Sequence, residues 1–267
     1  MLAATTPSTS VVSAALPSCS TPPSTKSFRL EAGPYAARLA LTESDREAAF
    51  RLRFLVFNLE LNEGLESAYA DGCDRDRFDE VCDHLIVEER STGTIVGTYR
   101  LQLGEVALRN YGYYSEQEFC FTPYEPIRSQ IVELGRACIH RDHRSSEVLN
   151  LLWRGITRYS LANGGRYMVG CCSLSSLDPA TGYAVYDALA NYMVEPELRT
   201  VPTTAYALPR PDALAGDGRP PKLLRTYLAV GARICGPPAI DREFCTIDFL
   251  TLLDLHTMHP RVAQRLL

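Results

Sequence analysis

The sequence predicts an α/β fold built on one mixed β-sheet, and three observations lead to this prediction. Short apolar runs alternate along the chain with segments whose apolar residues recur at helical spacing. A turn at residues 91–93 joins two of those runs as a hairpin. Hydrophobic residues make up 46% of the 267 residues and charged residues 22%, as in an ordinary globular protein. We therefore expect residues 34–267 to form one domain with a sizeable core.

Three predicted helices have identifiable start or stop signals. Thr42 or Ser44 offers an N-cap side chain to the first helix. Asn163, followed by two glycines, stops the second. Asp178 caps the third, with Pro179 in its first turn. The predicted helices cover residues 45–58, 147–162 and 178–192.

The remaining segments are assigned by composition. Residues 62–82 and 195–222 are polar or proline-rich and are predicted to be long loops. Residues 105–130 are predicted to be irregular, with short helical pieces, and residues 1–33 to be disordered because Ser, Thr, Pro and Ala dominate them. The predicted strands cover residues 38–42, 83–89, 94–103, 130–140, 167–174, 223–234 and 244–253, the last leading into a C-terminal helix.

Charge and cysteine content exclude several classes of protein. The 27 basic and 32 acidic side chains give a net charge of −5, which disfavours nucleic acid as a partner. No apolar run reaches the roughly 18 residues of a membrane-spanning helix, and the first 25 residues carry no basic residue of a secretory signal. The nine cysteines are scattered without a C-x-x-C pair. We expect reduced thiols in a cytoplasmic protein, without a bound metal.

Four short motifs place charged residues in a fixed order. They are Arg51-Leu-Arg53-Phe-Leu-Val-Phe57, Asp74-Arg-Asp76-Arg-Phe78-Asp79, Gly97-Thr-Tyr-Arg100 and Glu133-Leu-Gly135-Arg136. This combination resembles the acyltransferase family that contains the ornithine-acyl carrier protein N-acyltransferases, the first enzymes of ornithine-lipid synthesis. It is more distantly similar to the N-acyl-homoserine lactone autoinducer synthases. The resemblance runs from about residue 37 to 255 and implies a GNAT-like N-acyltransferase fold, in which helices flank a mixed central sheet.

The resemblance also implies a reaction. A long, 3-hydroxylated fatty acyl chain would pass from acyl carrier protein to the α-amine of L-ornithine and form lyso-ornithine lipid. The acyl carrier thioester is then a co-substrate, and no cofactor is bound. Residues 222–233 and 244–250 resemble the ornithine-lipid branch more than the lactone branch. The alternatives are an N-acyl synthase for lysine, glycine or tyrosine, an autoinducer synthase that binds S-adenosylmethionine, and a non-catalytic module that binds acyl carrier protein.

The charged residues suit an amino-acid acceptor. A guanidinium binds a carboxylate through two parallel hydrogen bonds, and an amine needs partners that only accept hydrogen bonds. An ion-pair network that fastens the acidic loop to the sheet is the alternative role for the same residues. Phe57 is expected either in the core or at the border of the acceptor pocket. The candidate carboxylate ligands are Arg53, Arg100 and Arg136, and the candidate amine ligands are Asp76, Asp79 and Glu133.

Glu133 and Arg136 are the predicted catalytic residues. The attacking amine must lose a proton, and burial of Glu133 on an apolar strand would raise its pKa towards the working range. Glu133 could then act directly or through water. Residues three apart on a flat strand point to opposite faces, so we predict a β-bulge near Gly135 that brings the two closer. In the GNAT fold such a bulge helps to separate two parallel strands, and the pantetheine arm enters there.

The loop at residues 140–147 lacks the glycines with which GNAT enzymes that use free coenzyme A bind pyrophosphate. This absence favours delivery of the acyl group by a carrier protein. Arg141 and Arg144 would meet the acidic surface of that carrier, whereas Arg154 and Arg158 fit a solvated helix face equally well.

Three tempting features are interpreted as structural. Cys171 is expected in the core near the end of a strand rather than as a nucleophile. His84 is expected to be a structural hydrogen-bonding residue. The apolar segment 249–255 is expected to pack inside the protein, and peripheral contact with the inner membrane stays open.

Overall fold

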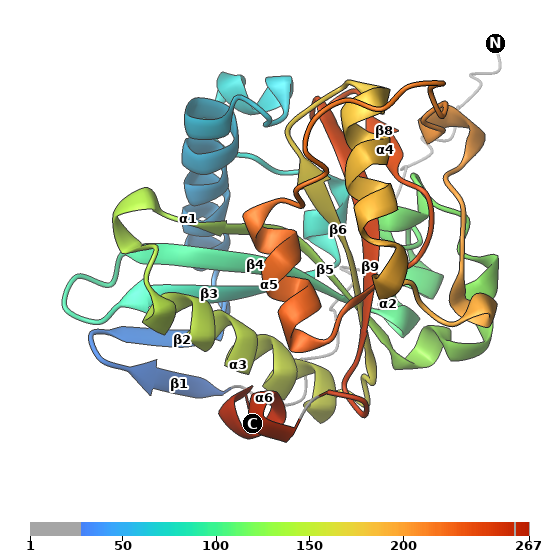
Figure 1. Ribbon diagram of the computed structural model, residues 1–267. Helices are drawn as coiled ribbons and strands as arrows, with labels where there is room; N and C mark the ends of the chain where they lie inside the picture. The colour runs from blue at the N-terminus through green and yellow to red at the C-terminus, as the bar shows by residue number, and fades with distance from the viewer. Residues whose placement is uncertain (1–27, 259, 267) are drawn as a thin grey trace, which may run out of the picture.

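The computed structural model describes residues 28–258 and 260–266, and its centre is a mixed sheet (Figure 1). Neighbouring strands follow the order β1-β2-β3-β4-β5-β6-β9-β7, and β8 also pairs with β9. β5 and β6 are parallel, whereas the other neighbouring pairs are antiparallel. The strands are β1 (Arg29–Ala32), β2 (Tyr35–Leu39), β3 (Asp83–Glu89), β4 (Ile95–Leu103), β5 (Ile131–Ile139), β6 (Tyr167–Leu174), β7 (Arg233–Ile234), β8 (Ala239–Asp241) and β9 (Thr246–Asp254).

Helices cover both faces of the sheet because successive side chains of a strand point to opposite faces. In β3, the ring of His84 packs edge-on against Phe50 of α1, with centroids 5.3 Å apart. The next residue, Leu85, lies close against Gly155 of α3. α1 and α3 therefore cover opposite faces (Figure 1). The α-helices are α1 (Glu43–Arg53), α2 (Gly104–Arg109), α3 (Ser146–Ala162), α4 (Pro179–Ala188), α5 (Lys222–Val230) and α6 (Pro260–Leu266).

The predicted helix caps are confirmed. The side chain of Thr42 accepts from the backbone of Asp45 at the start of α1, and Asp178 caps α4 in the same way. The first helix differs from its prediction in its second half. After Arg53 the chain continues as a π-helix, η1 (Phe54–Leu61), which ends at Asn62 in the left-handed region.

The predicted strand at residues 223–234 is wrong. Residues 222–230 form helix α5, and a strand of two residues follows as β7. Leu224 and Tyr227 are the buried residues of α5, and their spacing of three is helical rather than alternating. Gly231, at φ +110°, ends the helix as a left-handed cap. The helical pattern and the stop signal were both present in the sequence.

The ordered domain begins earlier than residue 34. β1 lies inside the segment predicted to be disordered and pairs with β2 from Arg29 opposite Arg38 to Ala32 opposite Tyr35. Arg29 and Arg38 both donate to the carboxylate of Glu88 on β3, at 2.8 Å each. The rest of the predicted disordered segment, residues 1–27, lies outside the described residues.

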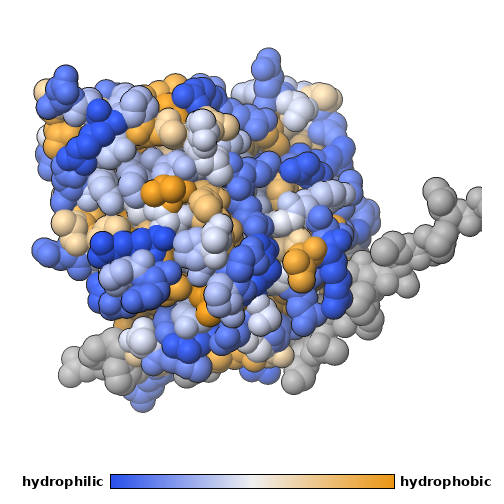
Figure 2. Space-filling view, turned by 90° about the vertical axis from the view of Figure 1, so that its right-hand side faces the viewer, coloured by the Kyte–Doolittle hydropathy of each residue, from blue (hydrophilic) through white to orange (hydrophobic). Residues whose placement is uncertain are grey.

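Residues 104–130 contain short helical pieces, as predicted, and their apolar side chains form part of a second hydrophobic core. Tyr113, Phe119 and Tyr124 are almost fully buried, and they pack with Val169 of β6 and Leu250 of β9. On the face turned to the viewer in Figure 2, apolar residues are scattered among polar ones, as on ordinary protein surfaces. Within the described residues, no helix is long and apolar enough to cross a membrane.

Candidate active site

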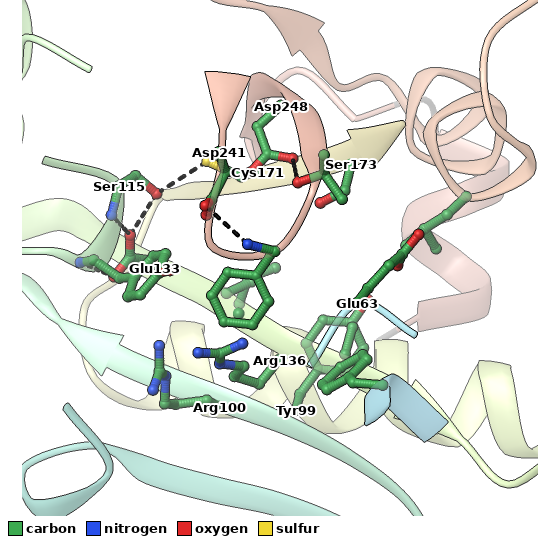
Figure 3. Close-up of a pocket in the computed structure, with 18 of the residues that line it drawn as sticks. Glu63, Tyr99, Arg100, Ser115, Glu133, Arg136, Cys171, Ser173, Asp241 and Asp248 are labelled. Carbon is green, nitrogen blue, oxygen red and sulfur yellow. Dashed lines mark hydrogen bonds between the residues drawn. The ribbon is translucent and has the colours of Figure 1, made fainter. Parts of the chain in front are cut away.

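A cavity of about 300 Å³ lies where β5 and β6 separate. The two strands pair in parallel up to Glu133 of β5 and Val169 of β6. Beyond these residues β6 no longer pairs with β5, but it stays paired with β9, its neighbour on the other edge. Residues 133–137 of β5 therefore line the cavity, together with Cys171 and Ser173 of β6. The lateral walls come from β4, η1, α5 and the segment that joins β8 to β9 (Figure 3).

The predicted bulge is present at Arg136. Opposite Thr98 and Arg100 of β4, β5 has one extra residue between Gly135 and Cys138. Arg136 takes φ +51°, which is rare for a side chain other than glycine or asparagine. The bulge turns Arg136 so that it lines the same cavity as Glu133.

Glu133 is a buried carboxylate held by three donors. Its Oε1 accepts from the backbone N–H of Ser115 at 2.8 Å and from the Ser115 hydroxyl at 2.6 Å. Its Oε2 accepts from the backbone N–H of Tyr114 at 2.8 Å. Burial raises the pKa of Glu133 above its ordinary value, and the hydrogen bonds from Ser115 and Tyr114 oppose this rise. The predicted direction of the pKa shift is confirmed, and the carboxylate is fixed in orientation.

Arg100 and Arg136 form the cationic side of the cavity. Nη1 of Arg100 lies 2.7 Å from Asp76 and 3.3 Å from Asp79. Nη2 of Arg136 donates to Asp76 at 3.1 Å, and its guanidinium lies 4.2 Å from the ring centroid of Phe244. Although burial opposes ionisation of Asp76, the neighbouring Arg100 and Arg136 hold its pKa below the ordinary value. The acidic loop thus supplies anions that keep both arginines in place.

Arg53 is separated from the cavity. Its side chain is 0% exposed, and it donates to Asp74 at 2.8 Å and to Asp79 at 2.7 and 2.9 Å. Neither Arg53, Asp76 nor Asp79 lines the cavity, whereas Phe57 does. For Arg53 and Asp79 the geometry favours the ion-pair network over contact with a substrate.

The two arginines assigned to the carrier lie on the surface outside the cavity. Arg141 is exposed and borders a shallow hollow with Leu55 and Leu59 of η1. Arg144 pairs with Glu60 at 2.7 Å. They stay a predicted contact surface for the carrier.

His84 and Cys171 have environments that disfavour chemistry. Burial lowers the pKa of His84 to about 4, so the ring is neutral, and its Nε2 lies 3.4 Å from the backbone oxygen of Asp79. Cys171 lines the cavity rather than the core, but burial raises the pKa of its thiol well above the ordinary value. A thiolate nucleophile is therefore disfavoured at this position.

The sequence reasoning missed an acidic wall of the same cavity. Asp241 ends β8 and Asp248 lies on β9, and both line the cavity opposite Arg100 and Arg136 (Figure 3). Glu118 lies behind them: it is 1% exposed, and its Oε2 lies 3.7 Å from the sulfur of Cys171. Asp248 lies in the segment 244–250 that resembles the ornithine-lipid branch, but no role was predicted for it, and no motif included Glu118 or Asp241. The available signal was three carboxylates placed among apolar or aromatic neighbours.

Comparison with known proteins shows to which family this chain belongs. Residues 52–154 match the acetyltransferase (GNAT) domain. The chain is 31% identical to the L-ornithine N(alpha)-acyltransferase of Brucella abortus over 86% of its own length and 87% of the relative's. The chain belongs to this acyltransferase family. The enzyme of the same name from Agrobacterium fabrum is 31% identical over 86% of this chain and 84% of its own.

A solved structure agrees with the fold of this family. An N-acyl amino acid synthase from uncultured soil microbes superimposes with a TM-score of 0.52 over 84% of this chain and 91% of its own, at 11% identity. The predicted GNAT-like fold is confirmed by the sheet and by the matching family domain. This family member is therefore an acyltransferase.

Proposed function

We propose that this acyltransferase joins a fatty acyl chain to the α-amine of L-ornithine. The similarity to L-ornithine N(alpha)-acyltransferases along most of the chain carries the proposal. The cavity supports it because one wall offers guanidinium groups to a carboxylate and another holds a buried carboxylate that can take a proton. The product is an N-acyl ornithine, the lyso form of ornithine lipid.

The reaction is aminolysis of a thioester. The nitrogen of the acceptor forms a bond to the thioester carbonyl carbon, the C–S bond breaks, and the thiolate leaves. The α-ammonium first gives one proton to Glu133, directly or through water. The second proton that the nitrogen loses as the amide forms passes to the departing sulfur. The raised pKa of Glu133 suits this role, because a general base works best when its pKa approaches the working pH.

Arg136 and Arg100 hold the α-carboxylate of the acceptor in this proposal. Both line the cavity, and Asp76 occupies one Nη atom of each. The remaining N–H groups can donate to a ligand. With the carboxylate held at this wall, the α-amine of the same carbon faces the side of the cavity that Glu133 closes.

The donor is a 3-hydroxyacyl chain on acyl carrier protein. The gap between β5 and β6 can admit a narrow pantetheine arm, and the loop before α3 carries Arg141 and Arg144 but no glycine. These arginines would meet the acidic carrier, and dependence on that carrier places the enzyme in the cytoplasm.

An in vitro assay tests the function. The full-length protein is incubated with 3-hydroxyacyl carrier protein and each amino acid in turn, and products are followed by mass spectrometry. A product with ornithine supports the proposal. A product with lysine, glycine or tyrosine alone would overturn the acceptor, and carrier binding without any product would indicate a binding module.

A further inference from the structure

The acidic wall of the cavity lacks a cation. Glu118, Asp241 and Asp248 are each at least 95% buried. Among the ion pairs of the described residues, none involves any of the three. A buried carboxylate without a cationic partner is costly when it is ionised, and it either stays protonated or meets a cation from a ligand or metal. Burial, with Asp248 and Asp241 nearby, raises the pKa of Glu118 well above its ordinary value, so Glu118 is the neutral member of the three. Asp241 and Asp248 are the two members whose charge a ligand can meet.

The contacts of these carboxylates leave oxygens for a ligand. Asp241 accepts from the backbone N–H groups of Glu243 at 2.8 Å and Phe244 at 3.1 Å, both through Oδ1. Asp248 accepts from Thr246 at 3.2 Å and from Ser173 (Figure 3), and it also shares a hydrogen bond with the carboxyl of Glu118. Within the described part of the chain, the buried Oε1 of Glu118 has no hydrogen-bond partner at all.

Two charged walls therefore face one cavity. Phe244 connects them: its ring stacks on the guanidinium of Arg136, and its backbone N–H donates to Asp241. A ligand that spans the cavity meets guanidinium at one end and carboxylates at the other. Glu133 is held separately by Ser115 and Tyr114 and remains available for the α-amine.

We propose that Asp241 and Asp248, backed by Glu118, bind the side-chain ammonium of the acceptor amino acid and thereby select ornithine over amino acids with neutral side chains. This inference rests on the proposed function and adds the residues that set its specificity. The three charges of ornithine then each have a partner: the carboxylate has the arginines, the α-amine has Glu133, and the δ-ammonium has the acidic wall. A site built around a buried charge rejects an acceptor that leaves this charge unpaired.

The test compares ornithine with norvaline, which has the same carbon skeleton but no δ-amine. Wild-type enzyme should prefer ornithine by about 100-fold or more in kcat/KM. Asp248→Asn should lower kcat/KM for ornithine by about 100-fold, mainly through KM, and leave norvaline turnover unchanged or improved. Asp241→Asn should act in the same direction. Asp254→Asn, on the same strand but paired with Arg166 outside the cavity, is the matched control.

The outcomes separate this inference from the proposed function. Wild-type enzyme that acylates norvaline as well as ornithine overturns the acidic subsite without any variant. Equal losses for both substrates in Asp248→Asn also overturn it. Loss of ornithine acylation after treatment with a chelator, restored by a divalent metal, would assign the cluster of Glu118, Cys171 and Asp248 to a metal instead. A wild-type enzyme that does not acylate ornithine overturns the proposed function, and the subsite with it.

Discussion

At the scale of single residues, Glu133 and Arg53 show how similar burial leads to different roles. Both side chains are almost fully buried and both make several hydrogen bonds. Glu133 has no counter-ion among the described ion pairs and lines a cavity, whereas Arg53 is paired with two carboxylates and lines none. The first arrangement favours proton transfer, and the second favours stability.

Replacing Glu133 by Gln should lower kcat strongly and leave the affinity for acyl carrier protein unchanged. A removed general base typically costs about 100- to 10,000-fold in rate, and the neutral amide keeps the shape of the side chain. We expect kcat to fall within this range, while the affinity for acyl carrier protein measured by calorimetry stays the same. The exposed Glu105→Gln on α2 is the control. Retention of more than half of the activity in Glu133→Gln would contradict the role as a base.

Replacing Arg53 by Met should affect folding rather than binding. The variant leaves Asp74 and Asp79 buried without their main cation, and breaking such a pair costs about 3 to 5 kcal/mol. Urea unfolding should show this loss in the free energy of unfolding. The KM for ornithine of the folded fraction should stay within about twofold, a difference of less than 1 kcal/mol. A variant that is as stable as wild type but has a greatly raised KM for ornithine would instead indicate that Arg53 binds the substrate.

At the scale of elements, the bulge in β5 is the device that builds the site. It separates β5 from β6 and turns Arg136 towards the cavity, at the cost of a left-handed backbone.

Arg136→Gly and Arg136→Ala lose the same guanidinium, but only glycine adopts φ +51° without strain. We expect Arg136→Gly to be more stable than Arg136→Ala by about 1 kcal/mol in urea unfolding, with a raised KM for ornithine in both. Equal stabilities would mean that the bulge relaxes.

Elements with local signals were predictable from the sequence, and those fixed by distant contacts were not. The cap at Thr42 and the cap at Asp178 each involve contacts within four consecutive residues, so the local sequence is enough to predict them. β1 forms because β2 and Glu88 are available to pair with it, which composition does not reveal. The same limit applies to the site. Glu133 and Arg136 belong to one motif, whereas Glu118 meets Asp241 and Asp248 only after its distant segment packs against the paired strands β8 and β9.

At the scale of the whole molecule, the cavity makes stability depend on pH and on the acceptor. Burial raises the pKa of Asp248 to about 6, and the neighbouring charge of Asp241 acts in the same direction. Hydrogen bonds with Ser173, Glu118 and Thr246 oppose this rise. Because the folded pKa lies above the ordinary value of 3.8, the group favours the folded state below about pH 4 and loses this contribution as pH rises through 6.

Thermal unfolding of wild-type protein and Asp248→Asn at pH 4.5 and 7.5 tests this linkage. Without ligand, the variant should be the more stable protein at pH 7.5, and this difference should be smaller at pH 4.5, where the folded carboxyl is mostly protonated. Ornithine binds the ionised carboxylate, so its stabilisation of the wild type should grow as pH rises, towards about 2.7 kcal/mol at 100 times Kd. Norvaline should not show this growth. If ornithine stabilised both proteins equally at both pH values, Asp248 would not face the ammonium, and the charge that selects the acceptor would lie elsewhere in the cavity.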